Sequence, residues 1–168
     1  MAPYEPVTQE ILAQLEAIAP GRVTAGEDVN PDYGRDEMPI YGVHMPEAAV
    51  EVLSTEEAAA VVKLCYDHNI PVTTRGAGTG LVGGCVPLYG GVVLVTTRMN
   101  RILDYDLENF TVTVQPGVLL NTLAEDAASK GLLYPPDPGE KFATLGGNVS
   151  TNAGGMRAVK YGCTRDYV

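Results

Sequence analysis

The chain has 168 residues and a hydrophobic share of 45%, which suits one globular core or two small ones. Its net charge is −10, and the first 60 residues carry twelve acids and only two arginines, which argues against nucleic acid or anionic lipid as a partner. The N-terminus shows no signal pattern and no apolar run reaches transmembrane length, so we expect a cytoplasmic protein.

Three cysteines, Cys65, Cys85 and Cys163, are widely spaced along the chain. Their spacing matches no zinc or iron–sulfur pattern, so we expect no metal site. An odd number of cysteines in a cytoplasmic protein predicts free thiols.

The N-terminal third predicts a helix over Glu10–Ile18 and then an irregular wrapping segment over 22–46, to which the sequence assigns no chemistry. We expect a domain boundary here, with residues 1–46 as an N-terminal helix and wrapping segment and 47–168 as the main domain. A strand at Ala49–Leu53 precedes a helix that Ser54 and Glu57 cap, and this helix is expected to end near Asn69.

Residues 71–84 read PVTTRGAGTGLVGG, a short strand followed by five glycines in nine residues. Glycine allows backbone N–H groups to approach a ligand closely, and successive N–H groups in such a loop form a concave anion site. Arg75 adds a positive charge where the strand ends. The segment therefore predicts a phosphate or pyrophosphate site, and the alternative is an ordinary glycine-rich connection.

The glycine spacing also fits a dinucleotide fingerprint, Gly78-x-Gly80-x-x-Gly83, which requires a helix after the last glycine. Pro87 and the pair Gly90-Gly91 leave no room for that helix before the next strand, Val92–Thr96. No Gly-Lys-Ser/Thr follows, so a Walker A loop is excluded as well.

The C-terminal half predicts a hairpin over Arg101–Tyr105 and Thr111–Gln115, and a helix over Val118–Lys130 that Gly131 ends. Residues 133–162 then form a long segment rich in Gly, Pro, Asn, Ser and Thr. Long ordered loops in compact domains are usually functional. Asn148, Ser150, Thr151 and Asn152 offer neutral hydrogen-bonding groups to a polar ring system, and the alternative is a surface loop that binds nothing.

Five segments occur in a fixed order: RGAGTGLVGG, QPGV, YPPDPGE, TLGGNVSTNAGG and KYGCTRDYV. As a set they resemble the FAD-linked oxidases of the vanillyl-alcohol oxidase type, which have a PCMH-type FAD-binding domain. The resemblance covers about two-thirds of the chain, from about residue 50 onward. Within this family the glycolate oxidase flavoprotein subunits and the FAD-dependent D-lactate dehydrogenases are the most similar.

The resemblance implies that residues 75–84 hold the FAD pyrophosphate and that 136–138 and 146–155 lie along the isoalloxazine and ribityl groups. The cofactor-binding residues expected on this basis are Arg75, Gly76, Ala77, Gly78, Thr79, Gly80, Leu81, Gly83, Gly84, Pro116, Gly117, Pro136, Asp137, Pro138, Thr144, Gly146, Gly147, Asn148, Ser150, Thr151, Asn152, Gly154 and Gly155. Some relatives attach FAD to a histidine of the first loop. This loop has Thr79 and no histidine, so non-covalent FAD is implied.

The implied activity is oxidation of a D-2-hydroxy acid of the D-lactate or glycolate type, with a quinone, an electron-transfer flavoprotein or an iron–sulfur subunit as electron acceptor. The family's catalytic residues belong to a substrate-capping domain, so none is assigned here, although Arg157 and Lys160 are candidates for contacts with substrate or phosphate. We interpret the chain as an N-terminal fragment, with a strand starting near Thr164 that leaves an open sheet edge for self-association.

Other functions stay open at this point. The chain could be a flavin-binding electron-transfer module without substrate chemistry, or an inactive fragment. A peptidoglycan-precursor reductase has the same flavin fold, but YPPDPGE does not resemble that family. For the fold we expect the α+β class, with a small mixed sheet flanked by helices and a separate hairpin.

Overall fold

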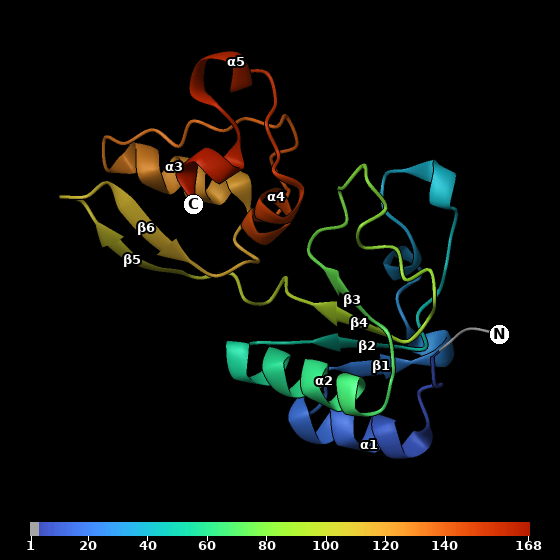
Figure 1. Cartoon of the computed structure of the whole chain (residues 1–168). Coiled ribbons are helices and arrows are strands. Elements are labelled where there is room, and N and C mark those ends of the chain that lie inside the picture. Colours follow the sequence, from blue (N-terminus) through green and yellow to red (C-terminus); the bar gives the residue numbers. More distant parts are fainter. Residues whose placement is uncertain (1–3) are drawn as a thin grey trace. The chain divides into compact units, whose positions relative to one another are not determined.

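The computed structural model describes residues 4–168, which form two compact units (Figure 1). The first unit ends at Arg98 and the second begins at Met99. The division falls between the glycine-rich residues 76–84, which lie in the first unit, and the long polar segment 133–162, which lies in the second.

The first unit is a four-stranded mixed sheet with two helices. Its elements are α1 (Gln9–Ile18), β1 (Val23–Ala25), β2 (Ala48–Glu51), α2 (Thr55–Asp67), β3 (Val72–Arg75) and β4 (Val92–Val95), with 3-10 turns at Gly26–Asp28, Pro31–Gly34 and Pro39–Tyr41. The strand order is β1-β2-β4-β3, in which β1 pairs antiparallel and the other pairs are parallel.

The two faces of this sheet are covered differently. Helices α1 and α2 lie side by side on one face (Figure 1), where their apolar stripes supply buried residues such as Leu15 and Val61. On the other face Val29 and Tyr33 pack against buried Val93 and its neighbours. The irregular segment after β1 is thereby held against the sheet, near the end of β3.

Strands β3 and β4 are parallel neighbours, so the chain must return along the sheet between them. The connection, residues 76–91, contains no helix. Gly91 is one reason why it can close tightly, because its φ is 67° and a Cβ there would collide with Pro71. The return loop therefore places the glycine-rich residues directly after the carboxyl end of β3.

The N-terminus of α2 is fixed by the predicted cap. Ser54 Oγ accepts a hydrogen bond of 3.2 Å from the Glu57 N–H. The Glu57 carboxylate reaches back to the N–H of Leu53 at 2.8 Å, rather than to that of Ser54, and it also pairs with Arg22 at 2.6 Å. The Arg22 hydrogen bond lowers the pKa of Glu57 and keeps the carboxylate charged.

The second unit consists of a two-stranded hairpin and short helices. Its elements are β5 (Ile102–Asp106), β6 (Thr111–Val114), α3 (Leu120–Ser129), α4 (Leu145–Thr151), α5 (Ala158–Tyr161) and a 3-10 turn at Thr164–Tyr167. The hairpin packs through Ile102, Val112 and Val114 on a core that includes Leu123 of α3 and Leu145 of α4.

The predicted α+β class, with a small mixed sheet and a hairpin, is confirmed. The long helices and the five predicted strands before residue 116 are found within a few residues of the expected bounds. Strand β1 was not predicted, because a strand of only three residues is too short to show a periodic pattern in the sequence. The boundary at residue 46 remains a prediction.

Two predictions in the C-terminal segment are wrong. Residues 133–162 are not one long loop, since α4 and α5 form within them. No strand begins near Thr164, because a 3-10 turn closes there instead. The Asp166 carboxylate accepts the N–H of Cys163 at 2.7 Å, and Thr164 Oγ1 donates to the Ala153 carbonyl at 2.6 Å.

Among residues 4–168, no group of three or more His, Cys, Asp or Glu side chains is placed to hold a metal ion. No helix in the same range is both long and apolar enough to cross a membrane.

The three cysteines are free, as predicted, and Cys65 is fully buried in α2. Burial raises the pKa of its thiol to about 11. A thiol whose pKa is higher in the folded than in the unfolded chain contributes stability below pH 9, and this contribution is lost as the pH rises from 9 through 11. We expect urea unfolding to show this loss for the native chain and not for Cys65→Ala, and an identical pH dependence in both proteins would contradict it.

Candidate functional site

The glycine loop, defined here as residues 76–84, begins where β3 ends. Within the described part of the chain, the N–H groups of residues 76–82 have no hydrogen-bond partner. Gly78 and Gly83 have positive φ angles of 80° and 71°, which side-chain-bearing residues rarely adopt. Consecutive free N–H groups beside such glycines form an anion site.

Arg75 lies under this loop and is only 6% exposed. Its Nη1 donates a 2.6 Å hydrogen bond to the Arg35 carbonyl, and its guanidinium lies 5.4 Å from the ring centre of Tyr33. The side chain also fills the space beside Gly78, where a Cβ would collide with it. Arg75 thus braces the loop and places a positive charge next to its N–H groups, while a direct bond to a phosphate remains a prediction.

Residues 33–41, to which the sequence assigned no chemistry, also hold the glycine loop. Asp36 Oδ2 accepts the N–H of Gly83 at 2.8 Å, and the Tyr41 ring packs where a Cβ of Gly83 would stand. The N–H of Glu37 donates to the Gly80 carbonyl at 3.0 Å. Sequence reasoning missed these residues because no local pattern marks a contact between segments more than 40 residues apart.

Cys85 follows the glycine loop, with its Sγ 3.5 Å from Arg75 Nη1. Burial raises the pKa of this thiol, and the Arg75 charge offsets only part of that effect. A thiol with a raised pKa is a weak nucleophile at neutral pH. We therefore assign Cys85 a packing role beside the loop rather than a role as a reactive thiol.

In the second unit, the QPGV and TLGGN segments meet. The N–H of Gly146 donates a 2.8 Å hydrogen bond to the carbonyl of Pro116, and a Cβ on Gly146 would lie 2.7 Å from Pro116 Cβ. Gly117 in turn donates to Met99 at 2.8 Å. The glycine at 146 is needed for this close approach of two backbones.

The PDP and NAGG segments meet in the same unit. Asp137 and Gly155 form a parallel β-bridge, and the N–H of Met156 donates to the Asp137 carbonyl at 3.2 Å. Gly155 has a φ of 95°, and a Cβ there would collide with that carbonyl. Pro136 is buried and Pro138 half-buried on either side of the bridge. Residues far apart in the segment are therefore brought together, while their expected contacts with the flavin remain predictions.

The polar side chains of this segment serve its own backbone. Thr144 Oγ1 accepts the N–H of Gly147 at 3.3 Å, Ser150 Oγ donates to Gly146 O at 2.8 Å, Thr151 Oγ1 donates to Gly147 O at 3.0 Å, and Asn152 Oδ1 accepts the Arg165 N–H at 3.0 Å. Asn148 is 5% exposed, and Gly154 packs against Cys163. The predicted contacts of these residues with a cofactor remain predictions.

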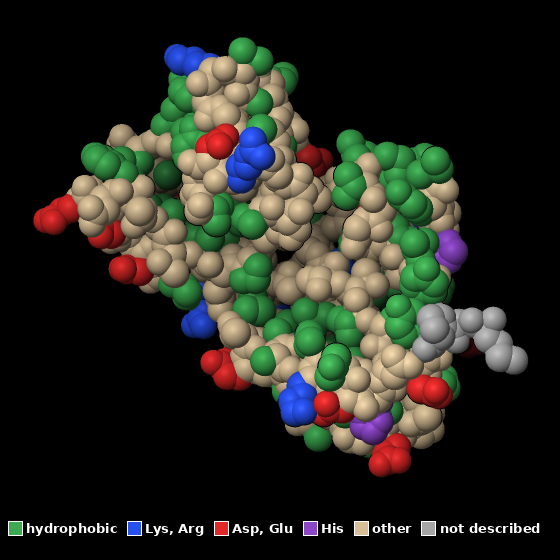
Figure 2. Space-filling model, viewed as in Figure 1, with side chains coloured by type: hydrophobic (Ala, Val, Ile, Leu, Met, Phe, Trp, Pro, Cys, Tyr) green, Lys and Arg blue, Asp and Glu red, His purple; other side chains and the backbone are tan. Residues whose placement is uncertain are grey.

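The two charged candidates after this segment have partners within the chain. Arg157 Nη2 lies 3.3 Å from Asp137 Oδ2, so it pairs with one of the predicted cofactor residues. The Lys160 ammonium lies 4.8 Å from the ring centre of Tyr161. Both side chains are exposed, and on the face that Figure 2 shows, acidic and basic side chains are scattered rather than gathered in one patch.

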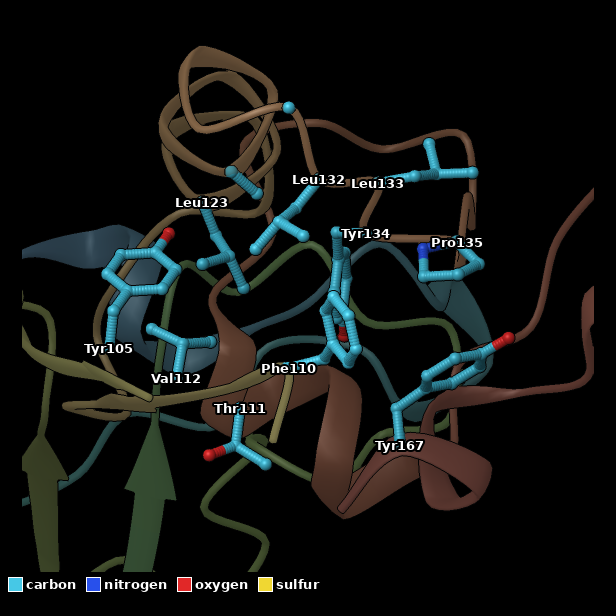
Figure 3. A pocket seen from close by; sticks show the side chains of 12 residues that line it. Tyr105, Phe110, Thr111, Val112, Leu123, Leu132, Leu133, Tyr134, Pro135 and Tyr167 are labelled. Carbon is cyan, nitrogen blue, oxygen red and sulfur yellow. The ribbon is translucent and has the colours of Figure 1, made fainter. Parts of the chain in front are cut away.

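A cavity of about 570 Å³ lies between the hairpin and α3 in the second unit (Figure 3). Tyr105 and Val112 face it from the hairpin, Leu123 and Leu132 from the helix side, and Tyr134 stands between them. Its lining contains no charged side chain and none of the predicted cofactor residues. Phosphate needs donors or positive charge, so the glycine loop, and not this cavity, is the candidate anion site.

Comparison with known proteins decides the family. A profile described as FAD binding domain matches residues 46–168. The chain belongs to the FAD binding domain family. FAD, the cofactor that the sequence predicts, is thereby confirmed, and the free N–H groups of the glycine loop fit the phosphates of such a cofactor.

Sequence similarity to individual proteins is consistent with this family. The chain is 64% identical over 165 residues to a D-lactate dehydrogenase of Anaerostipes hadrus, covering 98% of this chain and 35% of that protein. It is 44% identical over 149 residues to glycolate oxidase subunit GlcD of Bacillus subtilis, covering 88% and 30%. The chain thus spans about a third of the length of these relatives.

A solved structure shows the same fold. An alkyldihydroxyacetonephosphate synthase superposes with a TM-score of 0.83 at 23% identity, covering 99% of this chain and 32% of the other. At this identity the likeness concerns the fold alone. This chain and that part of the synthase therefore share a backbone fold although most of their side chains differ.

Proposed function

We propose that this FAD-binding domain holds the cofactor's pyrophosphate with the N–H groups of the glycine loop. The observation that carries the proposal is the run of free N–H groups at residues 76–82, in a chain of this family. Arg75 supports the site with its charge, and Gly80 and Gly84 leave space for close approach, since a Cβ there would meet no atom nearer than 3.6 Å. No histidine lies in the loop, which supports non-covalent binding.

We further propose that residues 136–138 and 144–155 of the second unit, with Pro116 and Gly117, contact the flavin end of the cofactor. The proposal is supported by two contacts that bring these residues together, one between Pro116 and Gly146 and one between Asp137 and Gly155. Bound FAD would supply the acceptor for a hydride from substrate. The residues of this chain bind and orient that acceptor, and no catalytic residue is assigned among them.

For the complete protein we propose oxidation of a D-2-hydroxy acid of the D-lactate or glycolate type. The support is the naming of its relatives, in particular the 64% identity to a D-lactate dehydrogenase. The electron acceptor would be a quinone, an electron-transfer flavoprotein or an iron–sulfur subunit. A cytoplasmic location and self-association also remain proposals, and the edge strands that pairing could use are β1 and β3 of the four-stranded sheet and the two strands of the hairpin β5–β6.

We expect the purified complete protein to reduce a redox dye with D-lactate, glycolate or D-2-hydroxyglutarate as the electron donor. The same assay with the L-isomers of the chiral substrates is the control. Turnover of none of the three donors by protein with bound FAD would contradict the substrate class and leave the cofactor site standing. Such a result would favour an electron-transfer module.

A further inference from the structure

We propose that Asp36 is a positioning residue that holds the glycine loop in its anion-binding shape, an inference that rests on the proposed pyrophosphate site. Asp36 is 8% exposed, and its two carboxylate oxygens have separate tasks. Oδ1 accepts the N–H of Met38 at 2.9 Å, which shapes its own turn. Oδ2 accepts the N–H of Gly83 at 2.8 Å, which fixes the end of the glycine loop 47 residues further along the chain.

The residues on either side of Asp36 also help to hold the loop. The Arg35 carbonyl accepts Arg75 Nη1 at 2.6 Å, which holds the guanidinium that fills the space beside Gly78, and the Glu37 N–H donates to the Gly80 carbonyl at 3.0 Å. Three consecutive residues therefore bond to the loop or to the arginine that braces it. The bonds at Gly80 and Gly83 leave the N–H groups of residues 76–82 free.

The hydrogen bond between Glu37 and Gly80 also orients an N–H group of the glycine loop. The carbonyl and N–H of one trans peptide point in opposite directions. Because the Gly80 carbonyl points toward Glu37, the N–H of Leu81, in the same peptide, points away from the 35–37 segment. The Glu37–Gly80 contact thus presents the Leu81 N–H on the side that the segment does not cover.

The charge of Asp36 makes the proposal testable, because a positioning role and a purely electrostatic role predict opposite changes in anion affinity when the charge is removed. A carboxylate near an anion site weakens anion binding through Coulomb repulsion, so removing its charge should strengthen binding if charge alone mattered. A positioning role predicts the opposite. In Asp36→Asn one amide oxygen replaces two carboxylate acceptors, and the amide NH₂ faces an N–H donor.

The experiment follows the amide signals of residues 76–84 by NMR in the 168-residue chain during titration with inorganic pyrophosphate. In the native chain we expect these signals to shift, and we expect Asp36→Asn to bind pyrophosphate about tenfold more weakly or worse, the effect of losing a hydrogen bond to a charged group. Asp32→Asn is the matched control, since it removes the same charge from an exposed pair with Arg35 and should bind as tightly as the native chain or slightly tighter.

Asp36→Glu keeps the charge and both acceptor oxygens, so it should recover part of the binding that Asp36→Asn loses. The amide signals of β2 and β4 report whether each variant has the native fold, and if Asp36→Asn does not fold, the comparison of Asp36→Glu with the native chain at equal charge carries the test. Unchanged or tighter binding by a folded Asp36→Asn would overturn the role of Asp36 and leave the pyrophosphate site intact. Absence of loop shifts in the native chain would overturn the pyrophosphate site, and the proposal for Asp36 with it.

Discussion

Gly80→Val is expected to abolish retention of FAD while leaving the fold intact. Gly80 lies outside the left-handed region, and a Cβ at this position would have its nearest neighbour, Asp36 Oδ2, at 3.6 Å, so the apoprotein accommodates a Cβ without a collision. We expect the two γ-methyl groups of the valine to reach into the space beside the free N–H groups, where the phosphates are proposed to lie. The loss should therefore concern binding and not folding.

The test uses a chimera in which this chain replaces the matched residues of the Anaerostipes hadrus D-lactate dehydrogenase, to which it is 64% identical. After gel filtration the flavin absorbance per protein should fall by at least about tenfold for Gly80→Val, which requires a loss of more than about 1.4 kcal/mol of binding free energy. Gly80→Ala should show a smaller loss. Ala128→Val adds bulk at an exposed position of α3, outside both candidate segments, and should keep the flavin. Full flavin content in Gly80→Val would argue that the loop is not the phosphate site.

Gly155→Ala is expected to open the contact between the two parts of the second glycine-rich segment. Gly155 has a φ of 95°, and its Cβ would collide with the Asp137 carbonyl, which also accepts the N–H of Met156. A left-handed conformation costs a residue with a side chain on the order of 1–3 kcal/mol, and displacement of the carbonyl adds to this. Native-state hydrogen exchange should show the Met156 amide exchanging at least about tenfold faster.

Gly139→Ala is the matched control for this variant. Gly139 has a φ of 90°, and no atom lies within 4 Å of the Cβ position. It therefore introduces the same backbone strain in the same segment without the collision. If Met156 exchange accelerates equally in both variants, backbone strain alone causes the acceleration. Gly155 would then not be required for the contact with Asp137.

The glycine loop could be predicted from sequence because its chemistry is local. Strand residues, clustered glycines and Arg75 follow one another directly, and Pro87 excludes a helix wherever the rest of the chain lies. The role of Asp36 could not be predicted, because its bond to Gly83 depends on how the segment after β1 packs on the sheet through Val29 and Tyr33. Long-range packing of this kind leaves no periodic signal in the sequence.

In the second glycine-rich segment, residues 133–162, amino-acid composition alone predicts the wrong secondary structure. Two consecutive glycines at 146 and 147 favour a loop, yet α4 forms through them. The helix is stabilised by the Thr144 cap and by the close approach of Gly146 to Pro116, a contact that requires glycine. Ser150 and Thr151, predicted as groups for a ligand, bond the carbonyls of their own helix. Tertiary contact thus overrides local propensity here.

The most direct test of the account is titration of the ¹⁵N-labelled 168-residue chain with FAD, followed by NMR. We expect weak binding, because a cofactor of this size is normally enclosed and this chain spans only about a third of its relatives. Weak binding still shifts the amide signals of the residues involved. We expect shifts at residues 76–84 of the first unit and at 136–138 and 144–155 of the second. Shifts confined to the cavity around Tyr105 and Tyr134, with the glycine loop unchanged, would contradict it.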